Sequence, residues 1–137
     1  MTLAIRWLHV AAMAVAFGGA FLVAWLSWRT RDHVIATAVR YEQVFWAAAG
    51  VLVMTGIGNL GAFGASLLDP STSWGTTLIA KLWLVAALIL VSLPRSLAVV
   101  LVSSQAGAGP VDLRPVYTVT TSIFAAIVAL AIVLANA

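Results

Sequence analysis

Residues 3–28 read LAIRWLHVAAMAVAFGGAFLVAWLSW, an apolar stretch with Arg6 and His9 near its leading end. An α-helix rises about 1.5 Å per residue, so roughly 20 apolar residues cross the hydrocarbon core of a bilayer. We therefore expect this stretch to be a transmembrane helix. Titratable groups inside such a helix are costly and tend to be functional, and His9 is the one histidine expected at membrane depth. Arg6 and His9 are thus candidate functional residues.

The composition of the whole chain indicates a membrane protein. Of 137 residues, 64% are hydrophobic and 8% are charged, and the mean hydropathy is +1.11, whereas about a quarter of the residues of a soluble domain are charged. The net charge of +3 is too small for a nucleic-acid interface. The chain has no cysteine, which excludes disulfides, thiolate catalysis, iron–sulfur clusters and covalent haem attachment.

Four apolar segments use most of the chain, so we expect a single all-α domain over residues 1–137. The predicted spans are residues 3–28, 41–63, 74–94 and 116–136. Pro94 either kinks or ends the third span, and Pro115 suits the first turn of the fourth. Short loops between spans favour an antiparallel four-helix bundle.

The distribution of basic residues predicts the orientation of this bundle. The first and third loops hold Arg29, Arg31, Arg40, Arg95 and Arg114. The second loop holds Asp69 and no basic residue. By the positive-inside rule the first and third loops are cytoplasmic. Both termini then face outward, and we expect a multi-pass protein of a bacterial cytoplasmic membrane.

The acidic residues are expected in or beside loops. They are Asp32, Glu42, Asp69 and Asp112. With no carboxylate predicted deep in the membrane, we expect no proton path lined by acidic residues. Neither a Ser/His/Asp arrangement nor a phosphate-binding loop occurs in the sequence, so hydrolytic chemistry has no support.

Small residues recur at helical spacing in three of the predicted spans. The first span has Ala12, Ala16, Gly19 and Ala20. The second has Ala47, Gly50, Gly58 and Gly61, with Met54 between them. The fourth has Ala125 and Ala129. Such stripes allow close helix packing in lipid. They could also leave room for a flat macrocycle or contact a neighbouring protein.

The predicted topology places several rare polar residues at one depth in the outer leaflet. Arg6 and His9 are three residues apart and share a helix face, roughly level with Asn59 and with Lys81, the one lysine of the chain. Arg6 and Lys81 could instead snorkel to the surface, and His9 could be an ordinary polar core residue. His33, in a charged loop, is expected to be solvated.

His9 lies near two thioethers in the predicted bundle, Met13 one turn along and Met54 in the second span. Imidazole with soft sulfur suits Cu(I) or haem iron. A second axial ligand of haem could come from neutral Lys81, from a methionine, or from the same histidine of a second copy. As cations, Lys81 and Arg6 could pair with a haem propionate.

Three segments of the sequence resemble known membrane proteins. They are WLHVAAMAVAFGGAFL (7–22), FWAAAGVLVMTGIGNL (45–60) and WGTTLIAKLWLVAALILVSLPR (74–95). Together they are similar to the copper-resistance D (CopD) membrane domain and to HemJ-type protoporphyrinogen oxidases. The resemblance implies that His9 and Lys81 are paired functional residues, associated with haem b in the HemJ-like branch and with copper movement in the CopD branch. The chain departs from both in its shorter length, and it has no external segment rich in Met and His.

The first functional hypothesis is a small b-type haem membrane protein for electron transfer or redox sensing. It would act as a homodimer or as a subunit of a larger redox complex, with His9 as axial ligand. The alternative is a CopD-like copper uptake protein that uses His9, Met13 and Met54. A HemJ-like protoporphyrinogen oxidase, hence an oxidoreductase, and an accessory subunit without cofactor remain further alternatives.

Overall fold

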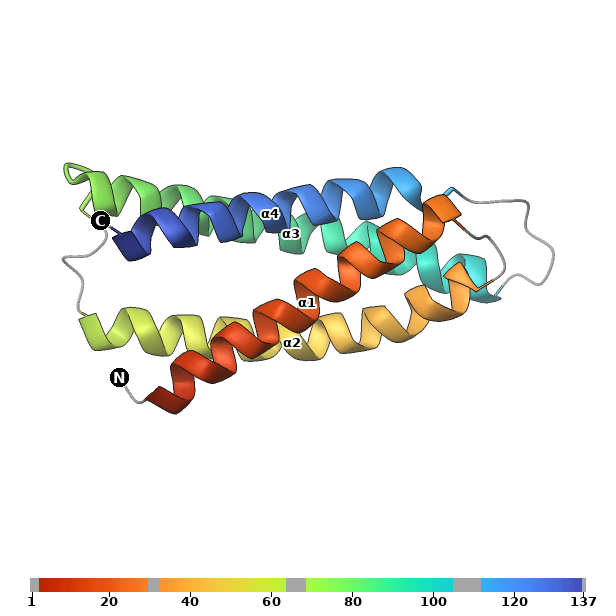
Figure 1. Cartoon of the computed structure of the whole chain (residues 1–137), viewed down its shortest axis with the longest axis horizontal. Coiled ribbons are helices and arrows are strands. Elements are labelled where there is room, and N and C mark those ends of the chain that lie inside the picture. The colour runs from red at the N-terminus through yellow and green to blue at the C-terminus, as the bar shows by residue number, and fades with distance from the viewer. Residues whose placement is uncertain (1–2, 30–32, 64–68, 105–111, 137) are drawn as a thin grey trace.

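The computed structural model describes residues 3–29, 33–63, 69–104 and 112–136. Within them the chain forms four helices and no strand: α1 (Leu3–Arg29), α2 (Val34–Phe63), α3 (Ser73–Ser104) and α4 (Arg114–Asn136). Successive helices run in opposite directions, and both ends of the chain lie at the same end of the bundle (Figure 1). The prediction of an all-α, antiparallel four-helix bundle is confirmed.

The helices pack as a ring in which α1 contacts α2 and α4, and α3 contacts α4 and α2. Figure 1 shows α1 crossing obliquely, from beside the end of α2 to the start of α4. Small side chains allow this crossing, because Ala12, Ala16 and Ala20 are buried in α1. The small-residue stripe predicted in α1 therefore packs inside the bundle.

The corresponding stripes of α2 and α4 face outward instead. Ala47, Gly50, Ala125 and Ala129 are exposed, whereas the side-chain positions of Gly58 and Gly61 lie outside the described part. In α2 it is Ala48 that is buried. The described residues of these stripes do not pack inside the bundle, because the buried face of each helix is set by larger side chains such as Phe45 and Phe124.

The outer surface of the bundle is strongly apolar. In the described part, α1, α3 and α4 are each long and apolar enough to cross a membrane. Large side chains point away from the bundle, among them Trp7 (67% exposed), Met54 (76%) and Trp83 (73%). In water such a surface would be costly, but it suits contact with lipid tails. The protein is therefore an integral membrane protein.

Two helices are longer than the predicted spans. α2 begins at Val34 rather than near residue 41, and α3 continues through Pro94 to Ser104. The Pro94 ring is exposed, so it meets no neighbouring helix, and proline is tolerated inside transmembrane helices. Pro94 does not end the helix. Both extensions bring charged residues into the bundle that a shorter span would leave in loops.

The turn before α3 is held by short polar side chains. The Gly75 amide donates to Thr72 Oγ1 (3.0 Å), and the Ser71 amide donates to Asp69 Oδ1 (2.9 Å). Bonds from the Ser71 hydroxyl and amide hold the pKa of the Asp69 carboxyl below its usual value. A Cβ at residue 75 would collide with the Asp69 carbonyl oxygen. Thr72 thus caps the helix that carries Lys81.

Candidate functional site

His9 is joined to α2 by one short hydrogen bond. Its Nδ1 lies 2.7 Å from Oγ1 of Thr55. The imidazole is half-buried, whereas Thr55 is buried, with 7% of its surface exposed. Sequence reasoning missed Thr55, although it stands in the Thr-Gly motif of the second segment quoted above. The feature of the sequence that could have identified Thr55 is a hydroxyl at membrane depth in an otherwise apolar run.

Lys81 approaches this histidine from α3, on the far side of the bundle. The side chain is half-buried, and its ammonium is near enough for its charge to act on the His9 imidazole. Among the described residues no hydrogen bond joins the two side chains. The two residues are thus in electrostatic range rather than in contact, and their functional pairing stays a prediction.

The other predicted site residues lie around His9 in different environments. Arg6 is exposed on α1, and Met13 is half-buried against the core. Met54 lines an apolar pocket of about 370 Å³ with Ile5, Leu8, Val51 and Thr55.

Asn59 belongs to α2, but its side chain lies outside the described residues. His33 is exposed, as expected.

The His9 region contains no carboxylate cluster that would hold a hard cation. Across the described ranges, no three His, Cys, Asp or Glu side chains come together as a metal-binding group. The soft donors predicted from the sequence are the thioethers of Met13, which packs against the core, and Met54, which is 76% exposed on α2. Thioethers bind Cu(I).

A second polar cluster lies nearer the other end of the bundle, around a buried ion pair. Arg95 of α3 has no exposed side-chain surface and forms a bidentate pair with Glu42 of α2. Nε donates to Oε1 at 2.8 Å, and Nη2 donates to Oε2 at 3.0 Å. The third nitrogen, Nη1, donates to Thr120 Oγ1 of α4 at 3.2 Å.

The carboxylate of Glu42 accepts two further hydrogen bonds. The Tyr117 hydroxyl donates to Oε1 at 2.6 Å, and the Ser96 hydroxyl donates to Oε2. The guanidinium of Arg95 also stands 4.4 Å from the centre of the Phe45 ring, a cation–π distance. Both charges are therefore compensated inside the bundle, with α2, α3 and α4 all contributing.

This cluster corrects two predictions. Glu42 was expected beside a loop and Arg95 in one, and both are buried. They enter the bundle because α2 starts early and α3 continues past Pro94. The apolar run LAVVLV after Arg95 was the available signal that the residue lies inside a helix.

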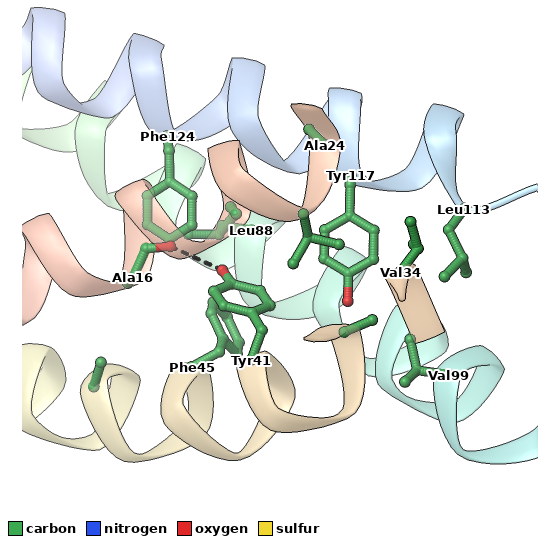
Figure 2. Close-up of a cluster of buried hydrophobic side chains, with 14 of the residues drawn as sticks. Ala16, Ala24, Val34, Tyr41, Phe45, Leu88, Val99, Leu113, Tyr117 and Phe124 are labelled. Atoms are coloured by element: carbon green, nitrogen blue, oxygen red, sulfur yellow. Dashed lines mark hydrogen bonds between the residues drawn. The ribbon is translucent and has the colours of Figure 1, made fainter. Parts of the chain in front are cut away.

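Aromatic side chains surround the ion pair and connect it to α1. Figure 2 shows Tyr41, Phe45, Tyr117 and Phe124 in the core, with the Tyr41 hydroxyl donating to the Ala16 carbonyl at 2.9 Å. Tyr41 and Tyr117 meet edge to face, with ring centroids 5.8 Å apart. All four helices therefore converge on this level of the bundle.

The fold and the two clusters define a four-helix integral membrane protein with a half-buried histidine near one end and a compensated ion pair near the other. The family model for copper resistance protein D matches residues 35–134, and the chain belongs to that family. The match covers nearly all of α2 and α4 and the whole of α3, and it leaves α1 and His9 outside. Neither the curated proteins nor the solved structures give a match, and the HemJ-like resemblance stays a prediction.

Proposed function

We propose that this protein binds copper in the membrane and takes part in its uptake, with Cu(I) as cargo. Membership of the copper resistance protein D family carries this proposal. The residue types support it, because the imidazole of His9 and the thioethers of Met13 and Met54 are ligands suited to Cu(I) and unsuited to Mg²⁺ or Ca²⁺.

The proposed binding site lies at the end of the bundle that holds both termini. His9 supplies the nitrogen ligand. Met54 lines the pocket it shares with Thr55, and its side chain, which points away from the bundle here, would turn inward to supply a thioether. Met13, one turn from His9 on α1, supplies a second sulfur donor. By the positive-inside argument this end faces outward in a bacterial cytoplasmic membrane, which suits uptake from outside.

Haem b remains the second candidate. The half-buried His9, tied to Thr55 by one ring nitrogen, has the arrangement of an axial ligand, and Lys81 and Arg6 would serve as second ligand or propionate partners. The family match gives this candidate no support. A homodimer or a larger redox complex belongs to this second candidate and stays a prediction.

Titration of the purified protein with Cu(I) against a competing chelator tests the proposal. His9→Ala should weaken Cu(I) binding by about tenfold or more, which corresponds to ~1.4 kcal/mol, and Met54→Leu should weaken it by a smaller factor. His33→Ala is the matched control, because His33 is exposed and far along the chain. Equal effects of His9→Ala and His33→Ala would refute the assignment. A Soret band that disappears in His9→Ala would favour haem instead.

A further inference from the structure

We propose that Thr55 is a positioning residue that fixes the tautomer of His9. It holds the imidazole with its proton on Nδ1, so that Nε2 keeps the lone pair that binds a metal. The tautomer assignment rests on the hydrogen bonds alone. Its link to Cu(I) rests on the proposed function.

The direction of the bond between His9 and Thr55 follows from the other bonds of the Thr55 hydroxyl. A threonine hydroxyl has one proton to donate and two lone pairs that accept. Thr55 Oγ1 donates to the Val51 carbonyl at 2.7 Å, with the Leu52 carbonyl at 3.2 Å sharing the same proton. With this proton on the backbone of α2, Oγ1 faces His9 Nδ1 as an acceptor and Nδ1 carries the hydrogen. This arrangement makes both bonds of the Thr55 hydroxyl at once.

Because Thr55 is buried, its hydroxyl favours one tautomer of His9 over the other. Thr55 is 7% exposed, and few water molecules can replace a lost partner in apolar surroundings. In the opposite tautomer the Thr55 hydroxyl would have to turn and donate to Nδ1 across the 2.7 Å contact, and it would give up its bond to the Val51 carbonyl. The Nδ1–H tautomer therefore keeps one hydrogen bond more than the alternative, and a lost bond is costly in buried surroundings. The Nδ1–H tautomer is favoured for this reason.

The same arrangement is the usual one for a metal-binding histidine. Such residues donate the hydrogen of one ring nitrogen to a nearby oxygen, which orients the ring and frees the other nitrogen for the metal. The charged group that acts on His9 from α3 is Lys81. Lys81 donates hydrogen bonds and accepts none as an ammonium, so it does not compete with Thr55 for the Nδ1 hydrogen.

Nitrogen-15 NMR of the histidine ring tests the assignment without any metal. The chain has two histidines, so a His33→Gln background leaves the His9 signals alone. Spectra are recorded in bilayers at a pH well above the usual histidine pKa. We expect a protonated Nδ1 and an unprotonated Nε2 in the parent protein and in Thr55→Ser, which keeps the hydroxyl. Thr55→Val removes the hydroxyl at nearly the same shape and should give a mixture of tautomers.

Cu(I) affinity measured on the same variants provides the second readout. Thr55→Val should weaken binding by roughly tenfold, at the low end of the effect of removing such a supporting bond, and Thr55→Ser should restore the parent value. An Nε2–H tautomer in the parent protein would overturn the proposal, even if Thr55→Val failed to fold. So would an unchanged tautomer in Thr55→Val. If the tautomer shifts as expected while His9→Ala leaves Cu(I) affinity intact, the copper assignment fails and the tautomer assignment stands.

Discussion

At the level of single residues, the Arg95–Glu42 pair is the most costly feature of the structure and the best compensated. Moving either charge out of water costs several kcal/mol, and only good geometry with further hydrogen bonds offsets it. Here the guanidinium makes three hydrogen bonds and the carboxylate accepts four. The partners come from α2, α3 and α4, so the pair sets the register of three helices.

Removing one charge of this pair should destabilise the protein strongly. Glu42→Gln leaves the Arg95 cation buried without its counter-charge, and the free energy of unfolding should fall by about 3–5 kcal/mol. Denaturant unfolding in detergent micelles measures the change. The double variant Glu42→Gln/Arg95→Met should recover most of the loss, because no unpaired charge remains.

Asp112→Asn is the control for this experiment. Asp112 faces Arg114 at 3.7 Å, with 61% of its side chain exposed. Exposed pairs contribute little, and asparagine can still accept the Arg114 amide bond that Asp112 accepts at 3.0 Å. A loss for Asp112→Asn as large as that for Glu42→Gln would contradict the assignment of the buried pair.

Lys81 should oppose the binding of a cation at His9. Its ammonium acts on the imidazole, and like charges repel more strongly where the dielectric constant is low. Lys81→Met should therefore increase the Cu(I) affinity of the purified protein several-fold, while Lys81→Arg should leave it close to the parent value. Weaker binding in Lys81→Met would instead make Lys81 a ligand.

At the level of helices, the interface between α1 and α2 depends on one glycine. Gly19 of α1 lies against the ring of Tyr41, whose hydroxyl reaches the Ala16 carbonyl one turn earlier. The absence of a side chain at residue 19 lets the Cδ2–Cε2 edge of the tyrosine ring approach the backbone of α1. Close packing through small residues is a principal source of helix association in lipid.

Gly19→Ala should separate these two helices. A Cβ at residue 19 would lie 2.5 and 2.6 Å from Cδ2 and Cε2 of Tyr41, and overpacking of this kind costs roughly 1–3 kcal/mol. Gly18→Ala is the matched control, since a Cβ there meets nothing within 4 Å and alanine favours the helix. Thermal unfolding of both variants measures the effect, and Gly19→Ala should unfold at a lower temperature than Gly18→Ala. Equal stability would show that the ring moves aside without cost.

At the level of the whole molecule, the burial of Arg95 removes one residue from the orientation argument without reversing it. The basic residues that remain in or near the first and third loops are Arg29, Arg31, Arg40 and Arg114. The opposite end carries Arg6 and Lys81, and Lys81 is half-buried. The excess of basic residues in the first and third loops still predicts that these loops are cytoplasmic.

Single cysteines test this orientation directly, because the chain has none of its own. His33→Cys reports on the loop between α1 and α2, and Ser71→Cys on the turn before α3; both residues are exposed. In intact cells a membrane-impermeant maleimide should label residue 71 and leave residue 33 unlabelled until the membrane is permeabilised. The reverse pattern would place the His9 end of the bundle inside.

Much of the architecture could be predicted because lipid imposes simple rules. Backbone groups in a bilayer must be satisfied within a helix, so four apolar runs predict four helices and short loops predict their antiparallel order. The same order places His9 and Lys81 at the end of the bundle that holds the termini, and their functional pairing stays a prediction. Glu42 was misplaced because helix ends are the least certain feature of a sequence, and the error at its helix start placed a core residue beside a loop.

The amino-acid sequence by itself determined that this is a helical membrane protein, how many helices it has, and which polar residues belong to the end that holds the termini. Hydrophobic length and period carry that information, since they act locally along the chain. Only the tertiary structure decided that Arg95 and Glu42 form a buried pair and that Thr55 meets His9. Those contacts join residues 53 and 46 positions apart, and their geometry depends on how the helices rotate and cross.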